Sequence, residues 1–361
     1  MGSSAFGCCR RAATPPAGQY TGVEEPLVSL DEIRRAADRV RGVVVRTSLL
    51  PYGPPIEGDP HGHPRAWLKP ESLQPIGAFK LRGAYNALAS LTPDERARGV
   101  VSHSSGNHAQ GVARAGRLLG IRVVVVMPRD APRTKMERVL ADGAEVDLVG
   151  PSGDERAARA TQLAEENGLV LIPSYDDRRI IAGQGTAGLE IAEQVAELAP
   201  PSVPFTVLVP VGGGGLASGV ATAVKALRPD AHVLGVEPEL AADARESLEA
   251  GRRVAWEPER LARTAADGMR STLSELTFRH LAAHLDGIVT VSEAEIARAM
   301  VRASREARLV LEPSGATSLA AWLFHAGELP DEGPVVCLLS GGNVDPERYA
   351  ELLAAGEAAG G

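Results

Sequence analysis

The feature that most constrains the fold is a regular alternation of short apolar runs with longer amphipathic stretches. The runs are rich in Val, Ile and Leu, and they span residues 100–103, 123–127, 145–149, 169–172, 207–211, 233–236, 288–291 and 335–339. The stretches between them carry apolar residues at helical spacing. This rhythm predicts parallel strands that are buried on both faces and wrapped by helices, and therefore the α/β class.

The chain has 361 residues, which is enough for two lobes that each bury a core of their own. Residues 100–176 contain several strand and helix units, with a distinctive lysine before them and a glycine-rich turn after them. We therefore expect a small domain over residues 100–176. It would be inserted into a large domain made of residues 26–99 and 177–355, and each domain would have an open, mostly parallel sheet.

The start of the chain is expected to be a disordered tail over residues 1–25, because it lacks an apolar segment of signal-peptide length. Ser29 and Glu32 then form a capping-box pattern. This pattern predicts a helix that runs to about Val40.

The formal net charge is −8, and acidic and basic residues are mixed along the chain. No basic patch is evident, so we expect neither nucleic acid nor a membrane as a partner. The cysteines, Cys8, Cys9 and Cys337, offer neither a disulfide framework nor a metal-binding spacing, and a cytoplasmic location is expected. The lysines that could supply a reactive amine are Lys69, Lys80, Lys135 and Lys225.

A run of four glycines, Gly212 to Gly215, follows the apolar run 207–211 and precedes an Ala- and Val-rich helical stretch. A strand, a glycine turn and a helix start expose backbone N–H groups, which is typical of a phosphate site. A purely structural turn is the weaker interpretation. A dinucleotide site is the serious rival, because Gly212, Gly214 and Ala217 match its spacing and Glu237 follows about 20 residues later.

Lys80 lies in a loop that leads into the first turn of a predicted helix. The helix dipole and partial burial both disfavour an ammonium there, so the amine could form a Schiff base and act as a base during turnover. A solvated helix lysine is the commoner role for a lone lysine. A second polar cluster, residues 102–108, follows a strand and opens a helix, and its hydroxyl, amide and N–H groups suit a carboxylate.

Six motifs lie at residues 77–84, 104–108, 182–186, 212–215, 312–315 and 340–343. Together, and in this order, they resemble those of the serine/threonine dehydratase and serine racemase family, pyridoxal-phosphate enzymes of fold type II, which are similar to the tryptophan synthase β chain. The resemblance covers nearly all of the chain from about residue 30 to 345. It favours pyridoxal phosphate over a nicotinamide cofactor.

The resemblance implies a role for each residue that matches a family motif. Lys80 would form the Schiff base, Phe79 would pack near the ring, and Asn107 would hydrogen-bond the ring hydroxyl. The phosphate would be held by Gly212, Gly213, Gly214, Gly215 and the Leu216 amide. Ser340 would meet the pyridine nitrogen. Because a hydroxyl cannot keep that nitrogen protonated as a carboxylate would, the ring would be a milder electron sink, which suits β-elimination.

The same resemblance assigns the substrate carboxylate to Ser104, Ser105, Asn107 and His108. Ser105 would also be a second acid/base, on the face opposite Lys80, whereas His108 would orient or pack. Glu237, the Ala241 carbonyl and Asp243 match a divalent-cation site of the family, which would suit Mg²⁺ or Ca²⁺. Helix-end acids that are favoured by the dipole remain an equally good interpretation of the two carboxylates.

The implied activity is a dehydratase or ammonia-lyase that converts L-threonine, and L-serine, to a 2-keto acid and ammonia. Residues 174–177 look more like those of threonine dehydratases, which favours threonine. The alternatives are a serine or other amino-acid racemase on the same scaffold, and a dehydratase for a related β-hydroxy amino acid such as hydroxyaspartate. We expect a homodimer or homotetramer.

Overall fold

The computed structural model describes residues 25–55, 64–104, 106–131, 133–150, 152–199 and 202–360. Its strands are β1 (Leu50–Pro55), β2 (Pro64–Pro70), β3 (Val100–His103), β4 (Val123–Pro128), β5 (Glu145–Val149), β6 (Val170–Leu171), β7 (Thr206–Pro210), β8 (His232–Pro238), β9 (Gly287–Val291) and β10 (Val335–Leu339). They form a six-stranded sheet in the order β1-β2-β10-β7-β8-β9 and a four-stranded sheet in the order β5-β4-β3-β6. Only β1 runs antiparallel to its neighbour. The predicted α/β class with two mostly parallel sheets is confirmed.

Each of the eight apolar runs coincides with a strand, to within a few residues at the ends. The sequence interpretation missed β1 and β2. Pro51 and Pro54 interrupt β1, whereas Pro64 and Pro70 stand at the two ends of β2, and these prolines hide the strand pattern. Proline is tolerated at β1 because this strand lies at the edge of the sheet, where one side of the backbone needs no ladder partner.

The α-helices of the described residues are α1 (Leu30–Val40), α2 (Lys80–Ala89), α3 (Pro93–Arg98), α4 (Asn107–Leu119), α5 (Arg133–Ala141), α6 (Gly153–Asn167), α7 (Arg178–Leu198), α8 (Gly215–Leu227), α9 (Asp243–Ala250), α10 (Pro258–Leu261), α11 (Glu275–His284), α12 (Glu293–Arg302), α13 (Pro313–Phe324) and α14 (Pro346–Ala358). Short 3₁₀ helices are η1 (Glu71–Leu73), η2 (Glu239–Ala241), η3 (Asp267–Met269) and η5 (Ala326–Glu328), and a π turn, η4 (Ala303–Ala307), extends α12. The capping box predicted at Ser29 is confirmed, since the Ser29 and Glu32 side chains each bind the other's backbone N–H.

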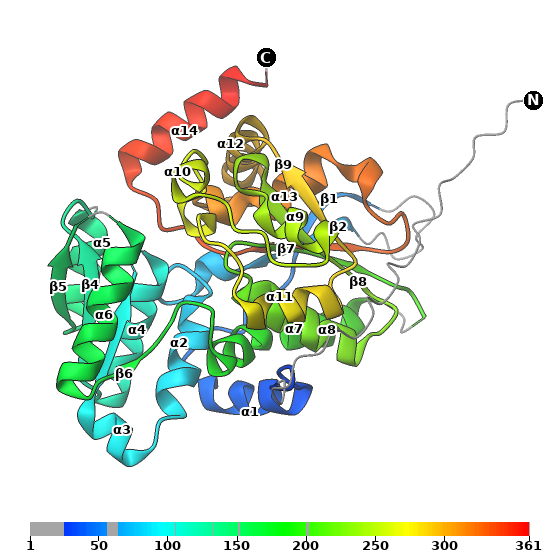
Figure 1. Cartoon of the computed structure of the whole chain (residues 1–361). Coiled ribbons are helices and arrows are strands. Elements are labelled where there is room, and N and C mark those ends of the chain that lie inside the picture. The colour runs from blue at the N-terminus through cyan, green and yellow to red at the C-terminus, as the bar shows by residue number, and fades with distance from the viewer. Residues whose placement is uncertain are drawn as a thin grey trace, which may run out of the picture.

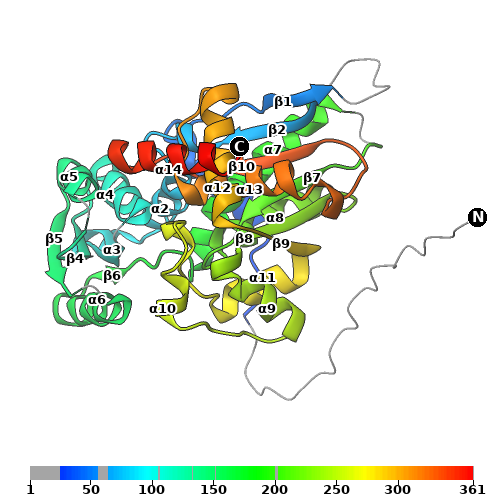
Figure 2. The same ribbon diagram turned by 90° about the horizontal axis from the view of Figure 1, so that it is seen from above.

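The helices cover both faces of each sheet. Apolar residues of α7, α8 and α11 pack on one face of the six-stranded sheet, and those of α12, α13 and α14 pack on the other. Apolar residues of α4 and α5 cover one face of the four-stranded sheet, and α6 covers the other. Figures 1 and 2 show the smaller sheet and its helices to one side of the larger one.

Helix α2 lies between the two sheets. Its apolar residues join the core of the smaller sheet, while the helix also packs along α7 of the larger one. The predicted division at residues 100 and 176 stays a prediction. The residues predicted as a tail lie outside the described part, apart from Glu25. No described helix is long and apolar enough to cross a membrane.

Candidate active site

The glycine turn, residues 212–215, leads from the end of β7 into the first residue of α8. Gly214 is the N-cap of the helix and has a φ of +86°, which an L side chain rarely adopts. Among the described residues, the backbone N–H groups of residues 212–217 have no protein acceptor, although the turn and helix start are largely buried. Buried N–H groups are nearly always paired, so a run of free ones at a helix start fits a bound phosphate.

Close packing also explains why this turn consists of glycines. A Cβ at Gly213 would lie 2.4 Å from the Tyr175 ring, and one at Gly215 would lie 2.8 Å from the Tyr175 Cβ. A Cβ at Gly212 would lie 2.9 Å from the Met269 Cα. The structural interpretation, which carried little weight in the sequence, therefore has support of its own beside the phosphate interpretation.

Lys80 is the first residue of α2, and a loop that is fastened to the end of β10 delivers it there. The Phe79 N–H donates to the Ser340 carbonyl at 3.1 Å, and the Gly342 N–H donates to the Gly77 carbonyl at 2.9 Å. The Lys80 Nζ donates to the Ser174 carbonyl at 3.1 Å and lies 5.2 Å from the centre of the Phe79 ring. These contacts hold the amine at the carboxyl end of the large sheet.

Burial lowers the pKa of Lys80 to about 8, and the Glu312 carboxyl opposes part of that shift. A larger fraction of the amine is therefore neutral near pH 7 than for an exposed lysine. Lys80 bonds Ser174, and the next residue, Tyr175, packs on Gly213 and Gly215. These contacts place the amine and the glycine turn in the same region.

Three buried charges and a partly exposed carboxylate anchor α2 just behind Lys80. Arg82 donates to both oxygens of Glu71, at 2.7 and 2.8 Å, and to both oxygens of Glu190, at 2.7 and 2.9 Å. Lys69 donates to Glu190 at 2.6 Å. The side chains of Arg82, Lys69 and Glu71 are fully buried, so each needs the others to offset its loss of hydration. We call Lys69, Glu71, Arg82 and Glu190 the charge network.

The predicted carboxylate site lies at the end of β3 and the start of α4. The Ser104 Oγ accepts from the Gly106 N–H at 3.2 Å. His108 is buried, and its Nε2 bonds the Ile172 carbonyl at 3.2 Å. Burial and the nearby Lys80 lower the pKa of His108 to about 3, so the ring is neutral and suited to packing rather than proton transfer. Ser105 lies outside the described residues.

Asn107 and Ser340 both lie beside the Lys80 loop. The Asn107 Nδ2 donates to the Glu312 Oε1 at 2.6 Å, and its Oδ1 accepts from the Asn343 Nδ2 at 2.7 Å. Ser340 is buried at the end of β10, and its Oγ donates to the Ser314 carbonyl at 3.3 Å. Of the predicted cofactor residues, Phe79, Lys80, Asn107 and Ser340 thus come together through direct contacts or through Glu312 and Asn343.

Several residues at this site had no role in the sequence interpretation. Glu312 and Asn343 lie within motifs of the family, so those motifs were a usable signal for both. Burial raises the pKa of Glu312 to about 8, and Asp267 adds to the shift. Lys135 and Asp267 form an ion pair of 2.7 Å between α5 and η3, and nothing in the sequence pattern linked these two residues.

The predicted cation residues lie together at the end of β8. Glu237 accepts from the N–H groups of Ala244 and Arg245, at 3.0 and 2.8 Å. The buried Asp243 Oδ2 has no partner among the described residues, and burial raises the pKa of this carboxyl to about 7. An orphaned carboxylate oxygen fits a cation. No group of three or more His, Cys, Asp or Glu side chains suited to a metal occurs in the described part of the chain.

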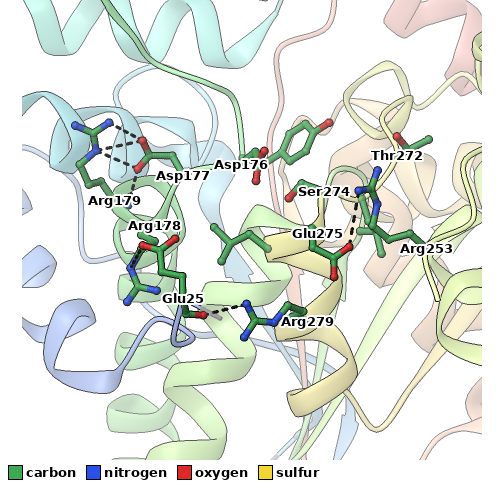
Figure 3. A pocket seen from close by; sticks show the side chains of 13 residues that line it. Glu25, Asp176, Asp177, Arg178, Arg179, Arg253, Thr272, Ser274, Glu275 and Arg279 are labelled. Atoms are coloured by element: carbon green, nitrogen blue, oxygen red, sulfur yellow. Dashed lines mark hydrogen bonds and ion pairs between the residues drawn. The ribbon is translucent and has the colours of Figure 1, made fainter. Parts of the chain in front are cut away.

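A pocket of about 850 Å³ shares Tyr175 and Leu273 with the surroundings of the glycine turn. Figure 3 shows that its acidic and arginine side chains largely face one another. Arg179 pairs with Asp177 at 2.6 Å, and Arg253 lies 3.9 Å from Glu275. Because acidic and arginine side chains are equal in number in this lining, the pocket has no net charge that would attract one sign of ligand.

The chain matches a family model described as "Pyridoxal-phosphate dependent enzyme" over residues 45–341. It is 39% identical to the L-threonine ammonia-lyase of Thermotoga maritima, over 91% of this chain and 78% of the relative. It is 37% identical to the L-threo-3-hydroxyaspartate ammonia-lyase of Saccharomyces cerevisiae, over 90% of this chain and 96% of the relative. The solved structure of maize serine racemase matches with a TM-score of 0.81 and 35% identity, over 91% of this chain and 98% of that one.

These relatives carry different activities at similar identities. The comparison therefore defines the family and leaves the reaction open. The chain belongs to the pyridoxal-phosphate dependent enzymes of fold type II, in the family of threonine dehydratases, hydroxyaspartate ammonia-lyases and serine racemases.

Proposed function

We propose that the protein is an ammonia-lyase that uses pyridoxal phosphate to convert L-threonine, and L-serine, to a 2-keto acid and ammonia. One observation carries most of the support. An amine with a lowered pKa, on Lys80, and a run of free N–H groups, at residues 212–217, lie at the same end of the large sheet. A Schiff-base enzyme with a phosphorylated cofactor needs both features.

The residues present fit pyridoxal phosphate. The free N–H groups of residues 212–216 would hold the phosphate, and Lys80 would hold the aldehyde carbon. Phe79 would pack near the ring, Asn107 would bind the ring hydroxyl, and Ser340 would meet the ring nitrogen. When bound, the cofactor supplies an electron sink that makes the Cα proton of an attached amino acid acidic.

The chain's own residues would supply the proton transfers. Lys80 would take the Cα proton of the substrate, since its lowered pKa leaves part of the amine neutral. The β-hydroxyl would then leave as water by taking up the proton that Lys80 holds, and hydrolysis of the enamine would yield the keto acid and ammonia. Ser104, Ser105, Asn107 and His108 would hold the substrate carboxylate while this happens.

A substrate panel tests the proposal. Purified protein would be incubated with L-threonine, L-serine and L-threo-3-hydroxyaspartate, and keto acid, ammonia and the enantiomer ratio of the remaining substrate would all be measured. We expect stoichiometric keto acid and ammonia from L-threonine and none from the Lys80→Ala variant. If only hydroxyaspartate reacts, the proposed substrate is wrong. If only the enantiomer ratio changes, the proposed reaction is wrong.

A racemase is the second candidate, because a serine racemase is among the similar structures. Racemisation needs a proton donor on the face opposite Lys80, and the family resemblance gives that role to Ser105. We expect Ser105→Ala to suppress interconversion of L- and D-serine by roughly 10²- to 10⁴-fold, and dehydration of L-threonine far less. Equal losses in both reactions would make Ser105 a binding or structural residue instead.

We also propose that Glu237, the Ala241 carbonyl and Asp243 bind Mg²⁺ or Ca²⁺. One support is the Asp243 oxygen that has no partner among the described residues. The other is the repulsion between the two buried carboxyls: burial raises the pKa of Glu237, and the nearby Asp243 raises it further. We expect Mg²⁺ to raise the melting temperature, and both EDTA and Asp243→Ala to cancel that gain. If neither treatment changes stability, these are ordinary helix-end acids.

A further inference from the structure

The two ends of the Asn107 side-chain amide have different partners. Its Oδ1 accepts from the Asn343 Nδ2 at 2.7 Å, and its Nδ2 donates to the Glu312 Oε1 at 2.6 Å. An amide nitrogen has two hydrogens, so one donor of Asn107 is left, while one lone pair of its oxygen is already engaged. These partners fix the orientation of an amide whose two ends have nearly the same shape.

Asn343 is the hub of this arrangement, and its own side chain is fully engaged. Its second amide hydrogen goes to the Ile76 carbonyl, at 2.8 Å, in the loop that leads to Lys80. Its Oδ1 accepts from the Arg138 Nη1 at 2.6 Å, on α5. Because a turned Asn343 would lose both carbonyl partners and face Arg138 with its NH₂ group, it cannot easily follow a turn of Asn107.

The absence of a side chain at Gly77 leaves space for the Asn343 side chain. Gly77 has a φ of +72°, and a Cβ there would lie 2.5 Å from the Asn343 Oδ1. The Gly342 N–H bonds the Gly77 carbonyl, so the turn that carries Asn343 is fastened to the lysine loop. Asn343 therefore connects the loop of Lys80, the start of α4 and the middle of α5.

We propose that Asn343 is a positioning residue that keeps the NH₂ end of Asn107 directed toward the cofactor ring. The inference rests on the proposed function, because it takes the ring oxygen to be the group beside Asn107. A donor at that place stabilises negative charge on the ring oxygen, with the proton on the imine nitrogen. An acceptor there would favour the proton on the ring oxygen, and the cofactor would then be a poorer electron sink.

The test uses purified protein loaded with pyridoxal phosphate, and the variant Asn343→Asp. A carboxylate at this position repels the Asn107 Oδ1 and releases the amide to turn. We expect the ratio of visible to near-ultraviolet absorbance of the bound cofactor to fall roughly fivefold, the population change that one lost hydrogen bond produces. We expect kcat to fall at least as much, with a smaller change in KM.

Two further variants control the result. Asn167→Asp adds the same charge at an exposed position on α6 and should leave the absorbance ratio and kcat unchanged. Asn343→Ala removes the donor without adding a charge, so it should give a smaller shift in the same direction. The Ala variant also decides the question if Asn343→Asp fails to fold.

A double variant separates positioning from a merely structural role. If Asn343 acts through Asn107, then Asn343→Ala should cause no further change in the absorbance ratio of Asn107→Ala protein. Additive changes would overturn the proposal, and so would an unchanged ratio in folded, loaded Asn343→Ala protein with only a lower melting temperature. Failure of the unmodified protein to bind pyridoxal phosphate would instead overturn the proposed function.

Discussion

The lysine segment, residues 74–83, and the glycine turn, residues 212–215, meet at one end of the large sheet but are held there by opposite means. The lysine segment is anchored by side chains, since Arg82 bonds Glu71 and Glu190, and Lys69 joins the charge network through Glu190. The glycine turn is shaped by the absence of side chains, because any Cβ there would meet Tyr175, Met269 or residues of the α11 region.

The difference predicts two kinds of fragility. Disturbing the charge network leaves a buried charge without a partner, so the cost should appear in the stability of the whole protein. Disturbing the glycine turn changes local shape, so the cost should appear first in cofactor affinity. Variants of the lysine segment and of the glycine turn can therefore test this difference.

The largest effect is expected from Arg82→Met. It leaves the buried Glu71 without its bonded cation and Glu190 with Lys69 alone, and removing one partner of a buried ion pair costs about 3–5 kcal/mol. The unfolding free energy of the cofactor-free protein, measured in urea, should fall by that amount. Arg133→Met, at an arginine that is 91% exposed, should change it by less than about 0.5 kcal/mol. Similar losses of stability in both variants would contradict the claim that the charge network contributes more than an exposed arginine.

The next effect is expected from Gly214→Ala, with Gly251→Ala as its matched control. Both glycines have a positive φ, of +86° and +63°, so both variants pay for backbone strain, about 1 kcal/mol. A Cβ at Gly251 meets nothing, whereas one at Gly214 lies 2.8 Å from Leu273 and Thr277 atoms. Overpacking should add about 1–3 kcal/mol, and cofactor affinity should fall roughly tenfold or more in Gly214→Ala alone. Equal affinity in the two variants would move the phosphate elsewhere.

A pH experiment compares two lysines of the same cofactor-free protein. Burial lowers the pKa of Lys80 to about 8, whereas for Lys135 the effect of burial is outweighed by Asp267, which raises its pKa. An amine-specific reagent, read out by peptide mass spectrometry, should therefore modify Lys80 with a midpoint near pH 8 and Lys135 only at higher pH. Because native Lys80 binds fewer protons than the unfolded chain above pH 8, its contribution to stability should rise with pH up to about 10.5. Equal midpoints for the two lysines would contradict the burial of the Lys80 amine.

The smallest loss of stability is expected at Thr186, a neutral residue that contacts the charge network. The Thr186 Oγ1 accepts from the Arg82 Nη1 at 3.0 Å, but the same Nη1 also donates to Glu190. The same hydroxyl donates to the Gly183 carbonyl at 2.7 Å. Thr186→Val should therefore cost only about 2 kcal/mol in urea unfolding, the value of two hydrogen bonds. A loss as large as that of Arg82→Met would mean that the hydroxyl, and not the carboxylates, anchors the arginine.

The sequence allowed prediction of features that arise from local patterns. The apolar runs predicted the eight parallel strands, because burial on both faces leaves a continuous apolar signal. The glycine turn was visible because four glycines interrupt such a pattern. The strands β1 and β2 were missed. Edge placement, which makes proline acceptable within β1, is a property of the assembled sheet, and β2 has proline only at its two ends.

Residues that act over long sequence distances could not be found in this way. Lys69 was only one of the candidate amines, and its pairing with Glu190 joins positions 121 residues apart. Asn343 and Asn107 are separated by 236 residues, and no period or spacing links them. Such contacts depend on how the two sheets and α2 are packed together, so they required the structure.

The most direct test is to identify the lysine that carries the cofactor. Protein loaded with pyridoxal phosphate would be reduced with borohydride and digested, and the modified peptide would be sequenced, with Lys80→Ala as the control. We expect one modified peptide, containing Lys80, and no fixed cofactor in Lys80→Ala. Attachment at Lys69, Lys135 or Lys225, or tight binding of a nicotinamide cofactor in place of pyridoxal phosphate, would contradict the account.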